Sequence, residues 1–349
     1  MAKRPVVQVR ADVSYQARAA HLVAKALVGP VMATVPISSW TIPFFGLLET
    51  AASRRRPPRW ASIEPVQFDG FRAEWVRADT ASDDTVVLYF HGGAFLFCGL
   101  ATHRLPVAAI SRASRAAALS VGYRHLPQVP LDGSIADCLT AYRYLLDQGV
   151  SPERIVFAGD SAGGHLAFTT ALRAVASGLP RPAGIVALSP WLDLDCETKL
   201  SRPSNRLGDY PPAKRMPKLV ELLTDGTFPA APELSPVNHD LSVLPPSLLI
   251  AAEGEVLRCD SELMAERLAA AGVPCTLQIW EGQIHAFPIM VGLIPEADRA
   301  IEEIGSFVRR VTRTKPSRRR ATAPTANGRS GTSRPRRTRR NNKLTAAAG

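Results

Sequence analysis

Short apolar runs that alternate with helical patterns constrain the fold of residues 60 to about 310 more than any other feature. Continuous apolar runs such as Thr85–Phe90 and Ser247–Ala252 are typical of strands that are buried on both faces. Helical periodicity appears in segments such as Asp132–Leu146 and Pro295–Val311. Because strands alternate with helices, the sequence predicts an α/β fold with a mostly parallel central sheet and helices on both faces.

The same patterns predict the remaining elements of this region. We expect a hairpin over Ile63–Arg77 that turns at Asp69-Gly70, strands over Ala118–Tyr123, Arg154–Ala158, Gly184–Leu188 and Cys275–Trp280, and helices over Gly163–Ser177, Asp260–Ala271 and, more approximately, Met216–Leu223.

The chain divides into three parts by composition. Residues 1–59 are expected to form an apolar, helical cap segment that ends in a basic, Pro-rich linker at Ser53–Arg59. Residues 60–312 form the α/β domain, in which residues 193–246 break the strand–helix rhythm and are predicted to be a lid-like insertion. Residues 313–349 are expected to be a disordered tail, because they contain almost no apolar side chains.

The formal net charge of +11 comes from that tail. Residues 313–349 hold twelve Lys and Arg and no acidic residue, which leaves the rest of the chain at about −1. We therefore expect the tail, and not the folded domain, to make any weak contact with an anionic surface or nucleic acid. A dedicated nucleic-acid-binding protein is disfavoured, because no basic surface interleaved with aromatic residues accompanies the tail.

Two further features concern the cell compartment. The five cysteines show no paired metal-ligand spacing, and we expect reduced, mostly buried thiols in a cytoplasmic protein. The 23 residues from Ala26 to Leu48 carry no charge and are long enough to span a bilayer, but Pro30, Pro36 and Pro43 interrupt them. We expect an apolar flap over a pocket or at a lipid interface, so the protein can lie peripherally at a membrane surface.

A candidate nucleophile lies in Gly159-Asp160-Ser161-Ala162-Gly163. This segment fits G-x-S-x-G, in which a sharp turn from a strand into a helix exposes the serine hydroxyl. The pattern alone also fits a simple tight turn. Its position between a predicted strand and a predicted helix favours the nucleophile elbow, with Ser161 as the nucleophile.

A glycine-rich loop, His91-Gly92-Gly93-Ala94-Phe95, follows the strand predicted over Thr85–Phe90. Consecutive backbone N–H groups in such a loop can stabilise an oxyanion. We predict that the N–H groups of Gly93 and Ala94, with that of Ala162, form this oxyanion hole. A phosphate-binding loop is the alternative, but no Lys or Ser/Thr follows in the required spacing. His91 is expected to brace the loop.

Among the seven histidines, His285 is the candidate general base. It follows the strand predicted over Cys275–Trp280, so it should lie at the same edge of the sheet as the elbow. His165 is on the elbow helix and is expected to point away from the site. His125 is interpreted as a structural histidine in a loop rather than as the base.

Three carboxylates compete as the acid that orients His285: Glu253, Glu255 and Asp260. The order serine, acid, histidine is typical of this kind of site. Glu253 directly continues the strand that ends at Ala252. Asp260, with Ser261, fits a helix N-cap. Glu255 lies on the turn between them, and we predict that it is the acid.

These motifs together resemble the hormone-sensitive-lipase-like family of bacterial carboxylesterases, within the α/β-hydrolase superfamily. The resemblance covers residues 60 to about 310 and rests on HGGAF, on the YR-x-x-P element at Tyr123–Pro127, on GDSAGG and on the late histidine. It implies the α/β-hydrolase fold with a helical cap, which the apolar N-terminal segment also resembles. By the same resemblance, Arg124 and Asp137 form a structural ion pair.

The chain departs from the family pattern in three places. Ala94 replaces the third glycine of the oxyanion loop, Glu255-Val256-Leu257 stands where Asp-Pro-Leu is usual, and Val129 precedes Pro130 in place of the usual aromatic residue. The resemblance also places Asp160 and Asp193 at family positions, where we interpret both as structural.

The resulting hypothesis is a serine carboxylesterase that hydrolyses short- to medium-chain acyl esters through an acyl-enzyme. The preference for such chains follows from the resemblance. The chemistry requires no metal and no organic cofactor, and the expected partner is a small acyl ester, with a homodimer also compatible with the sequence. Two alternatives stay open: an amidase or deacetylase with the same triad, and a non-catalytic ligand receptor on the same fold.

Overall fold

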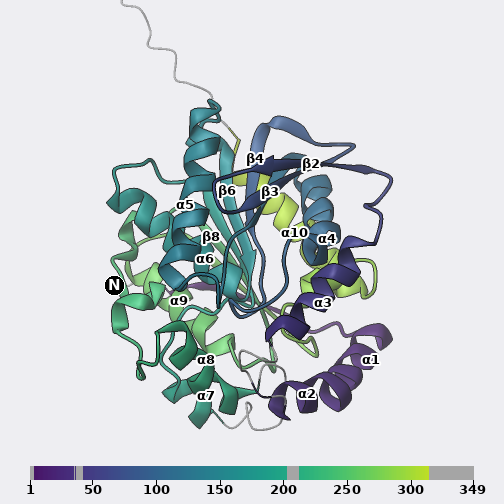
Figure 1. Cartoon of the computed structure of the whole chain (residues 1–349), viewed down its shortest axis with the longest axis vertical. Coiled ribbons are helices and arrows are strands. Elements are labelled where there is room, and N and C mark those ends of the chain that lie inside the picture. Colours follow the sequence, from purple (N-terminus) through teal and green to yellow (C-terminus); the bar gives the residue numbers. More distant parts are fainter. Residues whose placement is uncertain (1–3, 35, 37–41, 203–211, 314–349) are drawn as a thin grey trace, which may run out of the picture. The chain divides into compact units, whose positions relative to one another are not determined.

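The computed structural model describes residues 4–34, 36, 42–202 and 212–313, and these residues form one nine-stranded sheet (Figure 1). Its order is β1-β9-β8-β7-β6-β4-β5-β3-β2. Neighbouring strands are parallel except at β3–β5 and β2–β3. The strands are β1 (Val6–Arg10), β2 (Ala61–Gln67), β3 (Arg72–Ala78), β4 (Ser82–Phe90), β5 (Ala116–Gly122), β6 (Ile155–Asp160), β7 (Gly184–Leu188), β8 (Ser247–Ala252) and β9 (Cys275–Trp280).

Helices cover both faces of the sheet. Those described are α1 (Tyr15–Val23), α2 (Gly29–Thr34), α3 (Ile42–Ser53), α4 (Leu100–Ser114), α5 (Leu131–Asp147), α6 (Ala162–Ala176), α7 (Glu197–Ser201), α8 (Met216–Leu223), α9 (Arg258–Ala270) and α10 (Pro295–Val311), with a π-helical turn η1 (Ala24–Val28) between α1 and α2. Buried side chains of α5, α6 and α9 pack on one face, and those of α4 and α10 pack on the other. Side chains of β4 alternate between these two cores, with Leu88 in the first and Tyr89 in the second. The predicted α/β-hydrolase architecture is therefore confirmed.

Most predicted elements lie where the patterns indicated. β7, β8, β9, α8 and α10 have the predicted bounds, and the hairpin is formed by β2 and β3, with Gly70 at a φ of 80° in its turn. Local patterning sufficed for β7, β8 and β9 because they are buried on both faces, and for α8 and α10 because each presents one apolar face to the core.

Two elements differ from the sequence-based expectation. Residues 6–10, expected within a helical segment, form β1, which pairs in parallel with β9 at the edge of the sheet. The helix α4 was not predicted, because Pro106 lies within it and its N-cap residue, Gly99, has no capping side chain. Both elements depend on partners that are distant in the sequence.

Several contacts hold the N-terminal segment against the α/β domain, among them three that involve its secondary-structure elements directly. The first is the pairing of β1 with β9. At the second, buried Glu296 on α10 accepts hydrogen bonds from the backbone N–H and the hydroxyl of Ser14, the N-cap residue of α1. At the third, the Glu49 carboxylate on α3 accepts the backbone N–H groups of Ala101 (2.6 Å) and Thr102 (3.0 Å), at the start of α4.

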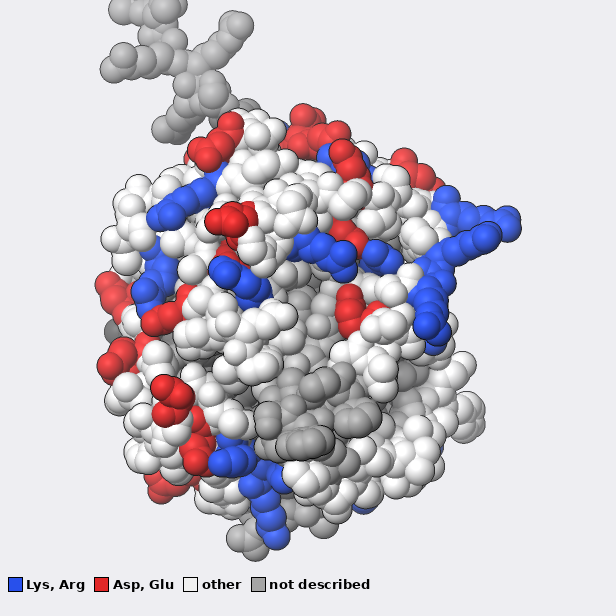
Figure 2. Space-filling view, in the orientation of Figure 1, with Lys and Arg blue, Asp and Glu red and all other residues white. Residues whose placement is uncertain are grey.

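The insertion at residues 193–246 contains α7, α8 and several short 3-10 turns, with residues 203–211 outside the described part. The tail beyond Arg313 also lies outside it. No helix among the described residues is long and apolar enough to cross a membrane. On the face shown in Figure 2, acidic and basic side chains are interspersed, as expected for a domain near neutrality.

Candidate active site

Ser161 occupies a sharp turn between β6 and α6. Its backbone has a φ of 52° and a ψ of −116°, a conformation that costs about 1–3 kcal/mol for a residue other than glycine. The turn is held because the Ser161 N–H donates to the carbonyl oxygen of Leu188 at 2.8 Å. A Cβ atom on Gly163 would lie 1.9 Å from the carbonyl oxygen of Phe90, so only glycine fits there. The predicted strand–turn–helix setting of this serine is confirmed.

The glycine-rich loop after β4 adopts an unusual backbone over three consecutive residues. Gly93, Ala94 and Phe95 all have positive φ, of 119°, 53° and 58°. A Cβ atom on Gly93 would lie 1.9 Å from the carbonyl oxygen of Phe97. Among the described residues, the N–H groups of Gly93 and Ala94 have no hydrogen-bond acceptor, and the N–H of Ala162 has none within α6 because it opens that helix. These are the three donors predicted for the oxyanion hole.

His285 and Glu255 form a buried pair on the loops that follow β9 and β8. His285 Nδ1 lies 2.6 Å from Glu255 Oε2, and the other carboxylate oxygen accepts the N–H of Ala252 at 2.9 Å. The pair forms because β8 and β9 are adjacent and parallel, so their carboxyl ends meet at one edge of the sheet. The next residue, Ala286, has a φ of 54° and donates its N–H to Ser189 Oγ at 2.9 Å. Of the three competing carboxylates, the structure brings Glu255 to the histidine.

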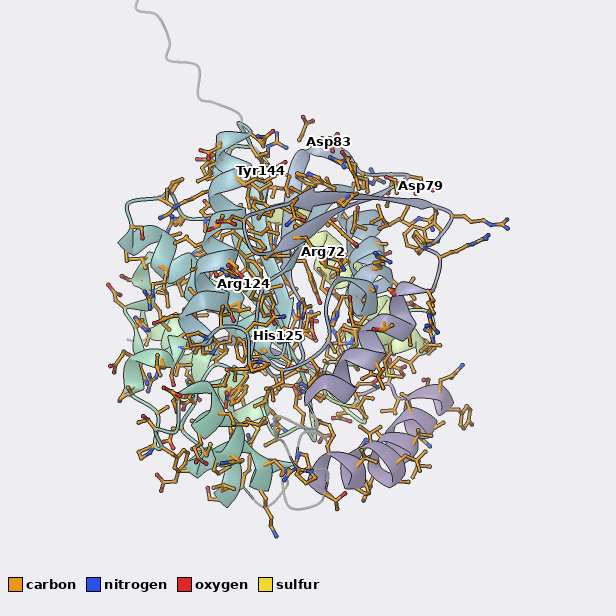
Figure 3. All side chains as sticks on the ribbon, viewed as in Figure 1. Arg72, Asp79, Asp83, Arg124, His125 and Tyr144 are labelled. Carbon is orange, nitrogen blue, oxygen red and sulfur yellow. The ribbon has the colours of Figure 1, made fainter. Side chains whose placement is uncertain are left out.

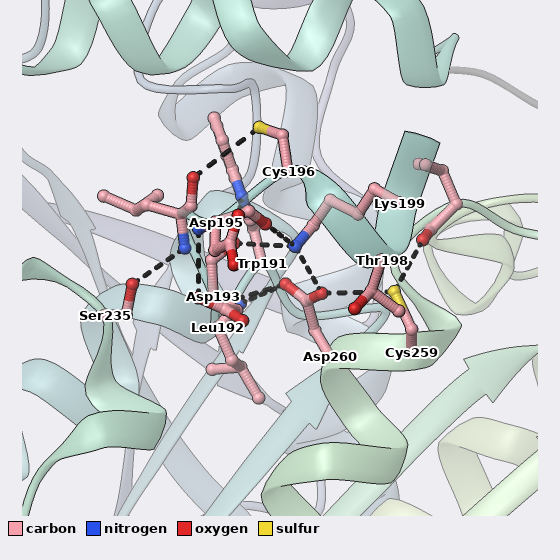
Figure 4. Close-up of polar contacts among 12 residues, drawn as sticks. Trp191, Leu192, Asp193, Asp195, Cys196, Thr198, Lys199, Ser235, Cys259 and Asp260 are labelled. Carbon is pink, nitrogen blue, oxygen red and sulfur yellow. Dashed lines mark hydrogen bonds and ion pairs between the residues drawn. The ribbon is translucent and has the colours of Figure 1, made fainter. Parts of the chain in front are cut away.

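Asp260 has a different partner. Its carboxylate lies 2.6 Å from Nζ of Lys199 and accepts the backbone N–H groups of Leu192 and Asp193, both at 2.9 Å (Figure 4). Both members of this ion pair are buried. Burial lowers the pKa of Lys199, but the charge and hydrogen bond of Asp260, together with nearby Cys259 and Asp193, raise it above its ordinary value.

The expectation that Asp260 caps α9 is wrong. The helix begins at Arg258, with Leu257 at the N-cap, and Asp260 lies in its first turn. Its carboxylate points to the insertion rather than to the helix end, because Lys199 of α7 compensates its charge there. Glu253 extends β8, since its N–H donates to the carbonyl oxygen of Trp280 at 2.8 Å.

Two other histidines are buried in neutral form. Burial lowers the pKa of His91 to about 3 and that of His165 to about 4. His91 Nδ1 lies 2.8 Å from the carbonyl oxygen of Gly92, and its ring stacks on Tyr123 at a centroid distance of 4.3 Å. His165 Nδ1 contacts the carbonyl oxygen of Trp191 at 2.9 Å. His91 therefore braces the loop, as predicted.

A second histidine–carboxylate pair lies beneath the loop and was missed in the sequence. Asp160 accepts hydrogen bonds from the Tyr89 hydroxyl (2.8 Å) and from the N–H of Gly92 (3.0 Å), and its Oδ1 lies 3.3 Å from Nε2 of His103. Burial alone would raise the pKa of Asp160, but the charge and hydrogen bond of His103 keep it below its ordinary value. Conversely, burial would lower the pKa of His103, and Asp160 raises it.

The ion pair that the family resemblance implied is present. Arg124 donates from Nη2 to Asp137 Oδ1 at 2.6 Å and from Nε to Oδ2 at 2.9 Å. Arg124 and its neighbour His125 are labelled in Figure 3, and His125 Nδ1 lies 2.9 Å from the carbonyl oxygen of Leu126. Both residues thus fix the loop that follows β5.

The described part of the chain shows neither a metal site nor a disulfide bond. There, no group of three or more His, Cys, Asp or Glu side chains is placed to hold a metal ion. All five cysteines are free thiols, and four of them are buried.

Comparisons with known proteins agree with this geometry. A family model described as the alpha/beta hydrolase fold matches residues 87–289. The chain is 36% identical over 298 residues to Esterase LipU of Mycobacterium tuberculosis. The matched residues cover 82% of this chain and 99% of that protein. It is 38% identical over 244 residues to an acetyl-hydrolase of Streptomyces hygroscopicus, covering 69% of this chain and 80% of that protein.

A crystal structure of an esterase from the bacterial hormone-sensitive lipase family superposes with a TM-score of 0.78 at 31% identity, covering 86% of this chain and 99% of that one. Family model, relatives and solved structure therefore point to the same group of enzymes. The chain belongs to the hormone-sensitive-lipase-like carboxylesterases of the α/β-hydrolase superfamily and is a carboxylic ester hydrolase.

Proposed function

We propose that the chain hydrolyses small acyl esters through an acyl-enzyme on Ser161. The Ser161 oxygen attacks the ester carbonyl carbon while His285 accepts the hydroxyl proton, and the protonated imidazole then donates that proton to the leaving alcohol. A water molecule repeats the sequence on the acyl-enzyme and releases the acid. Glu255 holds the imidazole in the required tautomer and stabilises its protonated form.

The three free N–H groups support a second part of the proposal, the oxyanion hole. Gly93, Ala94 and Ala162 donate to the oxyanion of each tetrahedral intermediate, and removal of one such donor typically costs about 3–4 kcal/mol in the barrier. Ala94 serves as well as glycine, because the donor is its backbone N–H. The α6 N-terminus adds the positive end of the helix dipole to the same point.

The hydrogen bond between Glu255 and His285 is the observation that carries this proposal. A non-catalytic ligand receptor has no need for a buried carboxylate such as Glu255 on Nδ1 of His285. It also has no need for a serine in a strained conformation at the end of β6, such as Ser161. An amidase or deacetylase would use the same groups, so parallel assays on an anilide and an ester separate it from the esterase.

Short to medium acyl chains are the proposed substrates. One relative is named an acetyl-hydrolase, and an esterase crystal, EstE5, that superposes with a TM-score of 0.75 was soaked with p-nitrophenyl butyrate. We propose that the N-terminal segment and the insertion at residues 193–246 enclose the acyl group.

Replacement of the nucleophile tests the proposal. Ser161→Ala should fold normally but lose a factor of order 10⁴ or more in kcat on p-nitrophenyl esters from acetate to palmitate. Ser177→Ala, at the exposed end of the same helix, is the matched control and should remain active. A serine-directed phosphonate should label Ser161, and labelling elsewhere with full activity in the alanine variant would refute the assignment.

The remaining partners are also proposals. The basic tail can contact anionic surfaces or nucleic acid electrostatically, and the protein can form a homodimer. Because an exposed tail contributes little to a folded core, truncation after Thr312 should leave kcat/KM within about twofold. Gel filtration and heparin retention at low and high salt test the two contacts.

A further inference from the structure

The helical stretch from α1 through η1 to α2 leaves most of its large apolar side chains exposed. Ala17 and Ala24 face the body of the protein and are 2% and 6% exposed, whereas Leu22 and Leu27 are 66% and 64% exposed. A surface helix normally buries its large apolar residues and exposes polar ones. This stretch therefore leaves large apolar side chains in solvent, next to the exposed Arg18 and Lys25.

The outward apolar residues form one stripe. Residues five apart lie above one another across a π-helical turn, and residues four apart do so in an α-helix. Leu22, Leu27 and Val31, which is 54% exposed, follow this spacing through η1 into α2. On α3, Leu47 adds a further side chain that is 61% exposed. In Figure 2, white, uncharged side chains cover the region where Figure 1 places α1, and charged side chains lie beside α3.

The charges of this segment are mostly positive. Residues 4–59 contain eight Lys and Arg but only two acidic residues, Asp12 and Glu49. Glu49 accepts the N–H groups of Ala101 and Thr102, and the exposed Asp12 lies 3.5 Å from Arg299. Of the cations, Arg10 pairs with Glu303 at 2.9 Å.

The linker after α3 supplies the densest group of cations. Arg54, Arg55, Arg56 and Arg59 are exposed, and none has an acidic partner among the described residues. Exposed apolar side chains together with unpaired cations match the two terms that bind a helix to an anionic bilayer: insertion of apolar side chains into the acyl boundary, and attraction to charged headgroups.

We propose that the N-terminal face, defined as the exposed apolar residues of 15–34 and 47–48 with Arg54–Arg59, docks the enzyme on an anionic lipid bilayer. A second copy bound through the same face would bring two sets of uncompensated cations together, which disfavours a dimer there. The face lies in the plane of the bilayer, because no described helix can cross one. The basic tail differs from this segment in composition, because it contains almost no large apolar residues.

Flotation of the full-length protein with phosphatidylcholine vesicles, with and without phosphatidylglycerol, tests this inference. We expect binding only to the anionic vesicles, and part of it should persist at high salt, because inserted apolar side chains are not screened. Leu22→Asn/Leu27→Asn should lower the partition coefficient by about tenfold and remove the salt-resistant part. Leu293→Asn, at a position that is 69% exposed outside this face, is the matched control.

Charge reversal tests the electrostatic attraction between the arginines and the anionic headgroups. Arg55→Glu/Arg56→Glu should weaken binding by at least about tenfold, whereas Arg143→Glu/Arg181→Glu, on exposed sites of the α/β domain, should not. All four variants should keep the melting temperature and the rate on a water-soluble ester.

Vesicle binding that is unchanged in Leu22→Asn/Leu27→Asn and is abolished by high salt would assign the contact to the tail and overturn the proposal. Absence of vesicle binding, with a dimer that these substitutions dissociate, would assign the face to a second copy instead.

Discussion

Two buried histidine–carboxylate pairs lie toward the carboxyl edge of the same sheet, and they differ in how their carboxylates are used. Glu255 meets His285 and one backbone N–H, that of Ala252. Asp160 meets His103 and also binds the Tyr89 hydroxyl and the N–H of Gly92. Glu255 therefore binds mainly one histidine, whereas Asp160 connects helix α4, strand β4 and the oxyanion loop.

The histidines differ in the same way. Both ring nitrogens of His103 are occupied, Nε2 by Asp160 and Nδ1 by the carbonyl oxygen of Gly99 (3.2 Å) and the hydroxyl of Thr102 (3.0 Å). Such a ring cannot exchange protons with a substrate. Its charge stabilises the carboxylate that supports Gly92, at the start of the oxyanion loop. A histidine beside a buried acid is thus no sign of a catalytic base until every contact of both groups is known.

The largest effect expected from this comparison is that of Glu255→Gln. The variant should fold, because glutamine can still accept the N–H of Ala252, but kcat should fall by about 10³–10⁴ since the imidazole loses its orienting charge. Steady-state kinetics with p-nitrophenyl butyrate measure this fall. A variant that retained near-normal turnover would show that Glu255 is not the triad acid.

Asp260→Asn should act on stability. Removal of one partner from a buried ion pair typically costs about 3–5 kcal/mol, because the buried Lys199 would lose the carboxylate charge that lies 2.6 Å from its Nζ. The replacement should lower the free energy of unfolding measured in urea, with kcat per folded molecule reduced by less than about tenfold. If turnover vanished in a protein of normal stability, the roles of the two acids would have to be exchanged.

Local pattern and topology sufficed to predict the strand–turn–helix around Ser161 and the neighbourhood of Glu255 and His285. The first needs only a strand, small residues and a helix in succession, and the second follows from adjacent parallel strands. The environment of Asp260 could not be predicted, because its partner Lys199 comes from the irregular insertion. The same holds for His103, which lies on a helix whose N-terminus is bound by Glu49, 52 residues earlier in the chain.

His103→Gln should cost less than Asp260→Asn, about 1–3 kcal/mol, because Asp160 keeps two other donors. The cost should depend on pH. The pKa of His103 is raised in the folded protein, so its stabilising contribution is fully present below about pH 6.5 and is lost as the pH rises through the raised value. Urea unfolding at acidic and alkaline pH should therefore show a larger difference between wild type and variant on the acidic side. An equal difference at both pH values would mean that His103 is neutral in the folded state.

The smallest effect is expected for Glu49→Gln, which tests whether the first turn of α4 depends on the N-terminal segment. The Glu49 carboxylate accepts two N–H groups at the positive end of α4, whereas glutamine can accept only through its single oxygen. We expect a loss of about 1 kcal/mol in the free energy of unfolding, with Glu302→Gln, on an exposed site of α10, as the control that changes little.

Because His103 lies in the same turn as Thr102, loosening of this turn should also weaken the contact of His103 with Asp160. Combining Glu49→Gln with His103→Gln should then cost less than the two separate losses added together, which is the signature of residues that share one network. Strictly additive losses would show that the N-terminal segment and the support of the oxyanion loop are energetically independent, and that Asp160 is held from within the α/β domain alone.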